Sequence, residues 1–228
     1  MDNGSEDYIG WIMGSSWRDA TNTMLDYSIS AHDMPQSFVN AIVWQLPFGK
    51  GRRWGSSLPG AVNQIFGNWE ASTIIRLNSG LPLWTIQSSR YGNPLQQYGF
   101  PQAQRPDLVG DPKPANQNAN NWINPAAFRA PAANTYGNAP RYIDSLRESP
   151  TRNVDLAVAK NFRVKEAFRI QFRGEFLNLF NTPQFGGGNQ WGTNIETCMD
   201  CGQFGAVYGT RNASRNVQLA LKAEFDDD

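Results

Sequence analysis

The sequence predicts an all-β fold of antiparallel, up-and-down strands joined by long loops. Its 228 residues include 21 Gly, 14 Pro, 8 Trp and 13 Phe but only 18% charged residues, which favours turns and strands over an ordinary helical domain. Apolar and polar side chains alternate with a period of two along several segments, as they do in strands that have one buried face. The connections between these segments are long and rich in Pro, Asn and Gly.

Charge argues against a nucleic-acid-binding protein, and hydropathy excludes a helical membrane protein. Lys plus Arg and Asp plus Glu each number 20, so the net charge is zero and no long-range field draws in nucleic acid. We therefore expect no nucleic-acid partner. No run approaches the roughly 20 apolar residues of a membrane helix, whereas a β-barrel needs only about 10 residues per strand and shows every second one to lipid.

The clearest predicted strands lie in the C-terminal third. Residues 168–180 place aromatic and aliphatic side chains at even positions and Arg169, Arg173 and Glu175 at odd ones. We expect the even side to face lipid and the odd side to form the water-facing wall of a barrel, although a surface strand of a soluble sandwich also alternates. Residues 217–225 repeat the pattern and end on an aromatic residue.

Three earlier segments fit the same period less cleanly. They are residues 38–46, 69–78 and 154–162, which brings the predicted strands to five. Asn40 interrupts the apolar side of the first, and Pro47 ends it because proline lacks the donor that a sheet ladder requires.

The predicted connections alternate between short and long. Residues 163–167 form a tight hairpin turn and 49–68 a somewhat longer one, whereas 88–150 and 181–214 are long polar loops. Up-and-down strands place the long connections at one end of the sheet. Outer-membrane barrels show this asymmetry, with short periplasmic turns and long extracellular loops.

These elements predict a simple domain organisation. Residues 1–35 form a loop or incomplete strand region, 36–225 form barrel strands with their loops, and 226–228 form an acidic tail. The start, MDNGSEDYIG, lacks the features of a secretory signal, which taken literally implies a cytoplasmic chain. Because five strands cannot close a membrane barrel, we expect instead that the chain is a piece of a longer protein.

Six blocks in consistent order resemble the C-terminal part of TonB-dependent receptors, in particular the group with an N-terminal carboxypeptidase-regulatory-like domain. The similarity spans most of residues 35–225. The blocks are QSFVNAIVWQLPFGKGRRWG, NWEASTIIRLNSGLPL, NPAAFRAPAANTYGNAPR, NVDLAVAKNFRV, FRIQFRGEFLNLFNTPQFG and RNVQLALKAEF.

The resemblance implies a location in the cell outer membrane and a role in transport. Such receptors are barrels of about 22 strands, closed by a plug, that import a bound substrate with energy relayed by TonB. The implied partners are outer-membrane lipid, the plug and other strands of the receptor, the TonB complex and the barrel assembly machinery. Phe225 would be the aromatic C-terminal signal for that machinery, although Asp226, Asp227 and Asp228 follow where such chains usually stop.

Candidate chemical motifs are few, and we expect that the chain is not an enzyme and needs no cofactor or metal. His32 is the single histidine, which rules out a zinc site built from several histidines and leaves one candidate for any catalytic triad. Gly186, Gly187 and Gly188 lack the strand-to-helix context of a phosphate-binding loop.

Two features of the long loops are candidate functional sites. Cys198 and Cys201 form a C-x-x-C pair, for which an extracellular disulfide is the preferred interpretation and a free dithiol the alternative. Loop aromatics could stack on a sugar or peptide ligand, or simply pack the loops together. They are Tyr91, Tyr98, Phe100, Trp122, Phe128, Tyr136 and Trp191.

A second function competes with the receptor interpretation. A secreted β-sandwich module that binds carbohydrate would also alternate along its strands and would hold its ligand with loop Trp and Tyr side chains. In a sandwich, however, the apolar faces of two sheets must meet.

Overall fold

The chain forms two compact units, which are described separately. The computed structural model describes residues 19, 21–85, 87, 104–165, 168–186, 188–189, 192–200 and 202–225. The sheet unit comprises residues 36–78, 151–183 and 213–228. The loop unit comprises residues 1–35, 79–150 and 184–212. No helix in the described part of the chain is long and apolar enough to cross a membrane.

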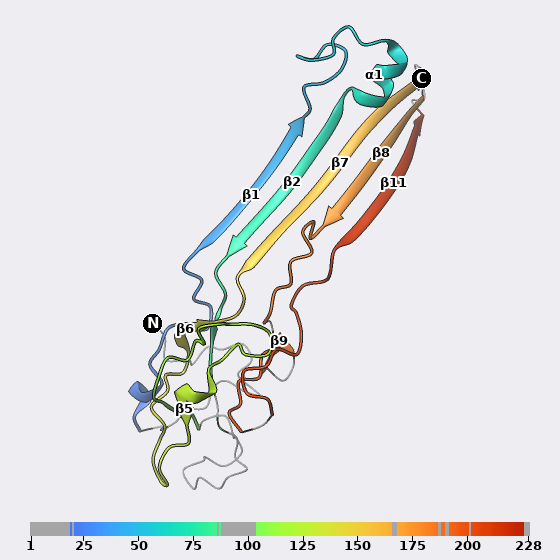
Figure 1. The fold of residues 1–228 in the computed structure, drawn as a ribbon. Helices are drawn as coiled ribbons and strands as arrows, with labels where there is room; N and C mark the ends of the chain where they lie inside the picture. The colour runs from blue at the N-terminus through green and yellow to red at the C-terminus, as the bar shows by residue number, and fades with distance from the viewer. Residues whose placement is uncertain are drawn as a thin grey trace. The chain divides into compact units, whose positions relative to one another are not determined.

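The sheet unit is one five-stranded antiparallel sheet (Figure 1). Strands that lie side by side in it also follow one another along the chain within this unit. Its strands are β1 (Ser37–Gln45), β2 (Trp69–Asn78), β7 (Thr151–Lys165), β8 (Phe168–Leu177) and β11 (Asn216–Phe225). Each pairs only with its neighbours in the order β1-β2-β7-β8-β11 among the strands described. The predicted antiparallel, up-and-down fold and its five strands are confirmed.

Two predicted strand ends are wrong. The turn expected over residues 163–167 is shorter, because β7 continues to Lys165 and β8 begins at Phe168. The strand expected to reach residue 180 ends at Leu177, because Asn178 and Asn181 adopt left-handed backbone with φ of 51° and 52°. Asparagine tolerates this conformation, which takes the chain out of the strand although the apolar alternation continues.

The connection between β1 and β2 contains a helix that the sequence analysis did not predict, α1 (Gly60–Phe66). The backbone crosses itself closely at Gly49 and Gly67. A Cβ on Gly49, whose φ is 117°, would lie 2.7 Å from the Gly67 Cα, so both positions need glycine. The Lys50 N–H donates to Asn63 Oδ1 at 2.6 Å and fixes the helix to the start of the turn.

The loop unit is built from short strands and 3-10 turns. Strand β3 (Pro82–Leu83) pairs with β6 (Ile143–Arg147), and β4 (Asp107–Leu108) pairs with β5 (Phe128–Arg129). The remaining elements are β9 (Gly188–Asn189), paired with β10 (Gly192–Thr193), and the 3-10 helices η2 (Thr23–Asp26) and η5 (Pro125–Ala127).

These segments enclose a hydrophobic core of their own. Its buried members are Leu83, Trp122, Ile123, Ala127, Phe128, Ile143, Leu146 and Ile195. They come from both long connections, which sequence analysis treated as irregular polar loops. That expectation is wrong for the described residues, because a few apolar side chains from distant segments meet and exclude water.

Candidate functional site: a two-faced sheet and a cross-linked loop unit

The register of the sheet unit places most of its large apolar side chains on one face, here called the apolar face. Phe172 of β8 pairs with Leu221 of β11 and with Lys160 of β7, and Lys160 pairs with Trp69 of β2. The same alternation runs through every strand. The residues of the apolar face, apart from Lys160, are Phe38, Asn40, Ile42, Trp44, Trp69, Ala71, Thr73, Ile75, Leu77, Arg152, Val154, Leu156, Val158, Phe162, Phe168, Ile170, Phe172, Gly174, Phe176, Val217, Leu219, Leu221, Ala223 and Phe225.

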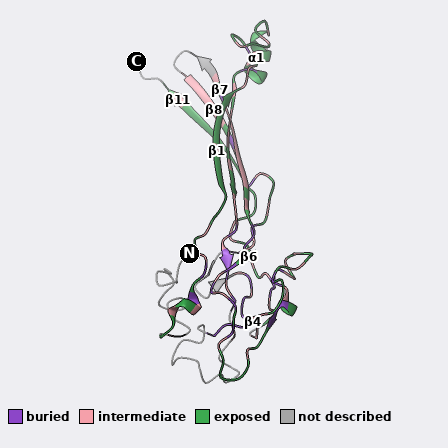
Figure 2. Ribbon diagram, turned by 90° about the vertical axis from the view of Figure 1, so that its left-hand side faces the viewer, coloured by how far each residue is buried: buried purple, intermediate pink, exposed green. Residues whose placement is uncertain are grey.

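Large side chains of the apolar face remain open to the surroundings. Strands β1 and β11 are exposed along nearly their whole length (Figure 2). Trp44 is 56% exposed, Leu219 69% and Leu221 74%. In a soluble sandwich a second sheet would bury such residues, and none of the described strands of this unit does so.

The opposite face, here called the polar face, carries the charges. On it Arg173 pairs with Glu175 at 2.6 Å, and Lys222 pairs with Glu224 at 2.8 Å. Arg76 of β2 reaches across to Asp155 of β7 at 3.4 Å. These are exposed pairs of the kind that form a hydrated wall and add little stability.

Strand β1 departs from this separation of faces. Val39, Ala41 and Val43 lie on the polar face, and Val39 and Val43 are 61% and 69% exposed. Ile74 of β2 is the register partner of Ala41, so β1 and β2 share a small apolar area on the otherwise charged face.

The aromatic end of β11 is tied to β8. Phe225 is the register partner of Phe168, and the two rings stack with centroids 4.8 Å apart. The α1 connection leaves β1 and enters β2 at this same end of the sheet, after Gln45 and before Trp69. Both long connections leave from the opposite end, which carries Asn78, Thr151, Leu177 and Asn216.

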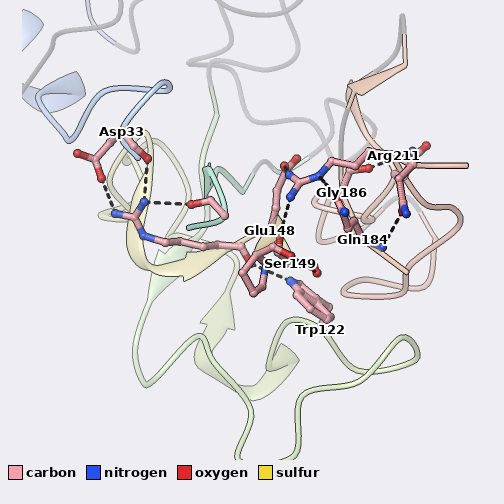
Figure 3. A network of polar contacts seen from close by, with 12 residues as sticks. Asp33, Trp122, Glu148, Ser149, Gln184, Gly186 and Arg211 are labelled. Atoms are coloured by element: carbon pink, nitrogen blue, oxygen red, sulfur yellow. Dashed lines mark hydrogen bonds and ion pairs between the residues drawn. The ribbon is translucent and has the colours of Figure 1, made fainter. Parts of the chain in front are cut away.

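A polar network joins distant segments of the loop unit (Figure 3). The buried Glu148 carboxylate accepts from Arg211 Nη1 at 2.9 Å, and Arg211 Nη2 donates to the Ser149 carbonyl at 2.8 Å. The Arg211 N–H donates to the Gln184 carbonyl at 2.9 Å. The residues after β6 are thereby fastened to both ends of the second long connection.

Arg147 is the second centre of this network. Its Nη2 donates to Asp33 Oδ2 at 2.6 Å and its Nη1 to the Gly80 carbonyl at 3.2 Å, while Asp144 also accepts from it. Partial burial acts to lower the pKa of the Arg147 guanidinium, but the hydrogen bonds with Asp144 and Asp33 outweigh it and raise that pKa. Asp33 belongs to the region 1–35, so the described end of this region is held to the rest of the loop unit.

The predicted loop aromatics are distributed differently from the sequence expectation. Trp122 and Phe128 are 8% and 7% exposed, and the Trp122 Nε1 donates to the Arg147 carbonyl at 2.9 Å. Of the two alternatives for the loop aromatics, these two residues follow the second, because both pack the loops together in the core of the loop unit. Tyr136 is half-buried. Four others lie outside the described residues: Tyr91, Tyr98, Phe100 and Trp191.

The remaining candidate residues do not form a chemical centre in the described chain. His32 is exposed, and no group of three His, Cys, Asp or Glu side chains is placed to hold a metal among the residues described. Cys198 is buried, but Cys201 lies outside the described residues, so their pairing stays a prediction. Gly186 is buried with φ of 119°, and a Cβ there would lie 2.6 Å from the Glu148 Cδ.

The residues that organise both units were not among those predicted from the sequence. Glu148 and Arg211 carry no local signal, because they meet only when two loops fold together. Lys160 does carry one, since it is a cation at an apolar position of the alternation Val154, Leu156, Val158. A lysine that breaks an apolar pattern indicates that its ammonium group has specific hydrogen-bond acceptors.

The fold agrees with the comparison against known families. A family model described as an outer membrane beta barrel domain matches residues 1–218. No curated protein and no solved structure matches the chain. The fold is an open antiparallel sheet with one apolar and one charged face, and the family model matches nearly the full length of the chain. The chain is therefore a member of the outer membrane beta barrel domain family and lies in the outer membrane.

Proposed function

We propose that this chain is the C-terminal barrel portion of a TonB-dependent receptor that binds and imports a substrate across the outer membrane. The observation that carries the proposal is the two-faced sheet, in which the five strands keep most large apolar side chains on one face and the surface ion pairs on the other. In a barrel, the apolar face meets lipid and the polar face lines the interior. The six blocks that resemble these receptors favour this family over other barrels.

The two edges of the sheet support a role within a larger barrel. Strands β1 and β11 each have one neighbour among the described strands. An unpaired strand edge is not tolerated in lipid, because its N–H and C=O groups would lack hydrogen-bond partners. The missing pairing would come from the other strands of the receptor, and the plug would fill the interior.

The loop unit is our candidate for substrate recognition. Its segments are held by Glu148, Arg147 and Arg211 rather than left as free chain. Pre-ordered loops on a rigid barrel lose less conformational entropy on binding than flexible ones. We assign no chemical step to them, so the proposed activity is binding and transport and not catalysis.

The test uses the complete receptor that carries this chain, purified from outer membranes in detergent. A folded barrel should migrate differently on a gel before and after boiling. The folded receptor should also retain the periplasmic domain of TonB in a pull-down, and the boiled receptor should not. A receptor that shows heat-modified mobility but does not retain TonB would be a barrel of another kind and would overturn the proposal.

A further inference from the structure

A cation lies on the apolar face, on the central strand β7 and near the end of the sheet at which α1 connects β1 to β2. Lys160 is the register partner of Trp69 and Phe172, whose rings pack edge to face 6.1 Å apart. The lysine is only 2% exposed. A bare ammonium group at this position of a lipid-facing wall would be unfavourable, so its partners matter.

Helix α1 supplies those partners. The Lys160 Nζ donates to the carbonyls of Ile65, at 3.1 Å, and of Gly67, which lie at the C-terminal end of the helix. The same Ile65 carbonyl accepts from Trp69 Nε1 at 3.0 Å. Because Lys160 projects from the apolar face, the C-terminal end of α1 is held on that side of the sheet.

The connection that contains α1, residues 46–68, turns large apolar side chains outward. Ile65 and Phe66 are 60% and 65% exposed. Phe48, Trp54 and Val62 are also exposed, and Trp44 precedes them on the apolar face. A helix on a water-exposed surface would bury such side chains against the rest of the protein, whereas an interfacial helix presents them to lipid acyl chains.

The same connection is purely basic. Residues 46–68 contain Lys50, Arg52 and Arg53 and no Asp or Glu. Lys50 and Arg53 are exposed, and the Arg53 guanidinium lies 5.4 Å from the centre of the Trp54 ring. Cations beside an exposed aromatic ring match the phosphates and the upper acyl region of an anionic phospholipid layer.

We propose that residues 46–68 form an interfacial anchor outside the barrel, with α1 immersed in the membrane surface and with Lys50 and Arg53 on anionic phospholipid headgroups. Lys160 holds this anchor against the lipid-facing wall. The assignment of the anchor to the periplasmic leaflet rests on the proposed function, which places the Phe225 end of the sheet in the periplasm.

The first experiment measures immersion in the complete receptor, reconstituted in nanodiscs that contain phosphatidylglycerol. With Cys198 and Cys201 changed to Ser, nitroxide labels are placed singly at Phe66→Cys, Leu221→Cys and Ala133→Cys. Leu221 reports the apolar face, and Ala133 is an exposed residue of the loop unit. We expect labels at positions 66 and 221 to collide with oxygen and to be shielded from a water-soluble nickel chelate, and the label at 133 to show the reverse.

The second experiment measures how much the basic residues contribute to the preference for anionic lipid. Lys50→Gln with Arg53→Gln removes two exposed cations of the anchor, and Lys113→Gln with Arg129→Gln removes two from the loop unit as a matched control. Preference for spin-labelled phosphatidylglycerol over phosphatidylcholine should fall by about fivefold per cation in the first variant. It should be unchanged in the control. Heat-modified mobility verifies that each variant is folded.

The outcomes separate the anchor from the barrel. If position 66 meets the nickel chelate while position 221 is in lipid, or if position 66 is shielded from both reagents by a protein contact, the anchor is wrong and the barrel stands. If position 221 is itself in water, the lipid-facing assignment of the sheet fails together with the anchor. Equal lipid preference in the two double variants would overturn the headgroup assignment.

Discussion

Arg211 Nη1 donates to Glu148 Oε2 across 2.9 Å, although the two residues are 63 positions apart in the chain. The Glu148 side chain is 6% exposed and that of Arg211 21%. The pair therefore links the end of one long connection to the other inside the loop unit. Removal of one member leaves a buried charge without its partner, which makes the pair the first target for mutation.

Arg211→Ala should lower the free energy of opening of the loop unit by about 3 kcal/mol, because it removes the guanidinium that pairs with the buried Glu148 carboxylate and donates to the Ser149 carbonyl. Hydrogen exchange of the loop amides in the folded receptor measures this. Arg129→Ala is the control, since its 3.5 Å pair with Asp107 is exposed on the arginine side and should contribute at most about 1 kcal/mol. Equal effects of the two changes would refute a central role for the Glu148 pair.

Gly80→Ala should disrupt the pairing of β3 with β6. A Cβ at Gly80 would lie 1.9 Å from the Glu148 carbonyl oxygen, so the backbone of one segment must move, at a cost of about 3 kcal/mol. At Gly110 the nearest atom to an added Cβ is 3.6 Å away, and Gly110→Ala should change stability by less than about 0.5 kcal/mol. Thermal unfolding of the loop unit, followed by protease sensitivity, compares the two. An unaltered Gly80→Ala protein would show that the close approach is absent.

Leu221→Arg should reduce the amount of folded barrel in the outer membrane far more than Gln218→Arg. Both residues are exposed on β11, but Leu221 lies on the apolar face and Gln218 on the polar face. An arginine at a lipid-facing midplane position costs roughly 2–4 kcal/mol, whereas one on the polar face, beside other charged side chains, costs little. The folded fraction is read from heat-modified mobility. Similar losses for both variants would contradict the assignment of faces.

The topology predicts opposite accessibility for two exposed residues. In the complete receptor with Cys198 and Cys201 changed to Ser, Ala133→Cys should react with an impermeant maleimide on intact cells, because the proposed function places the long connections outside the cell. Ser56→Cys, in the connection between β1 and β2, should react only after the outer membrane is opened. Both positions are exposed, so folding does not hide either. Labelling of Ser56→Cys alone on intact cells would show that the barrel is inverted.

The sheet was predictable from sequence because strand alternation is a local property. The register confirms the two faces expected at residues 168–180, down to Phe172 opposite Leu221. Strand ends were less predictable. Asn178 ends β8 by adopting a left-handed backbone, and its N–H donates to Asp155 Oδ1 at 2.9 Å, a partner on another strand. The alternation of side chains contains no information on that hydrogen bond.

The sequence by itself determined the all-β fold, the separation of apolar and charged faces and the length of the connections, because these depend on residues close together in the chain. Only the tertiary structure decided that the long connections share a core, since Trp122 and Ile195 meet there from different connections. It also decided the environment of Lys160, which interrupts an apolar alternation in the sequence. The carbonyls of Ile65 and Gly67 accept its hydrogen bonds, and a contact across more than 90 residues depends on the folded path of the chain.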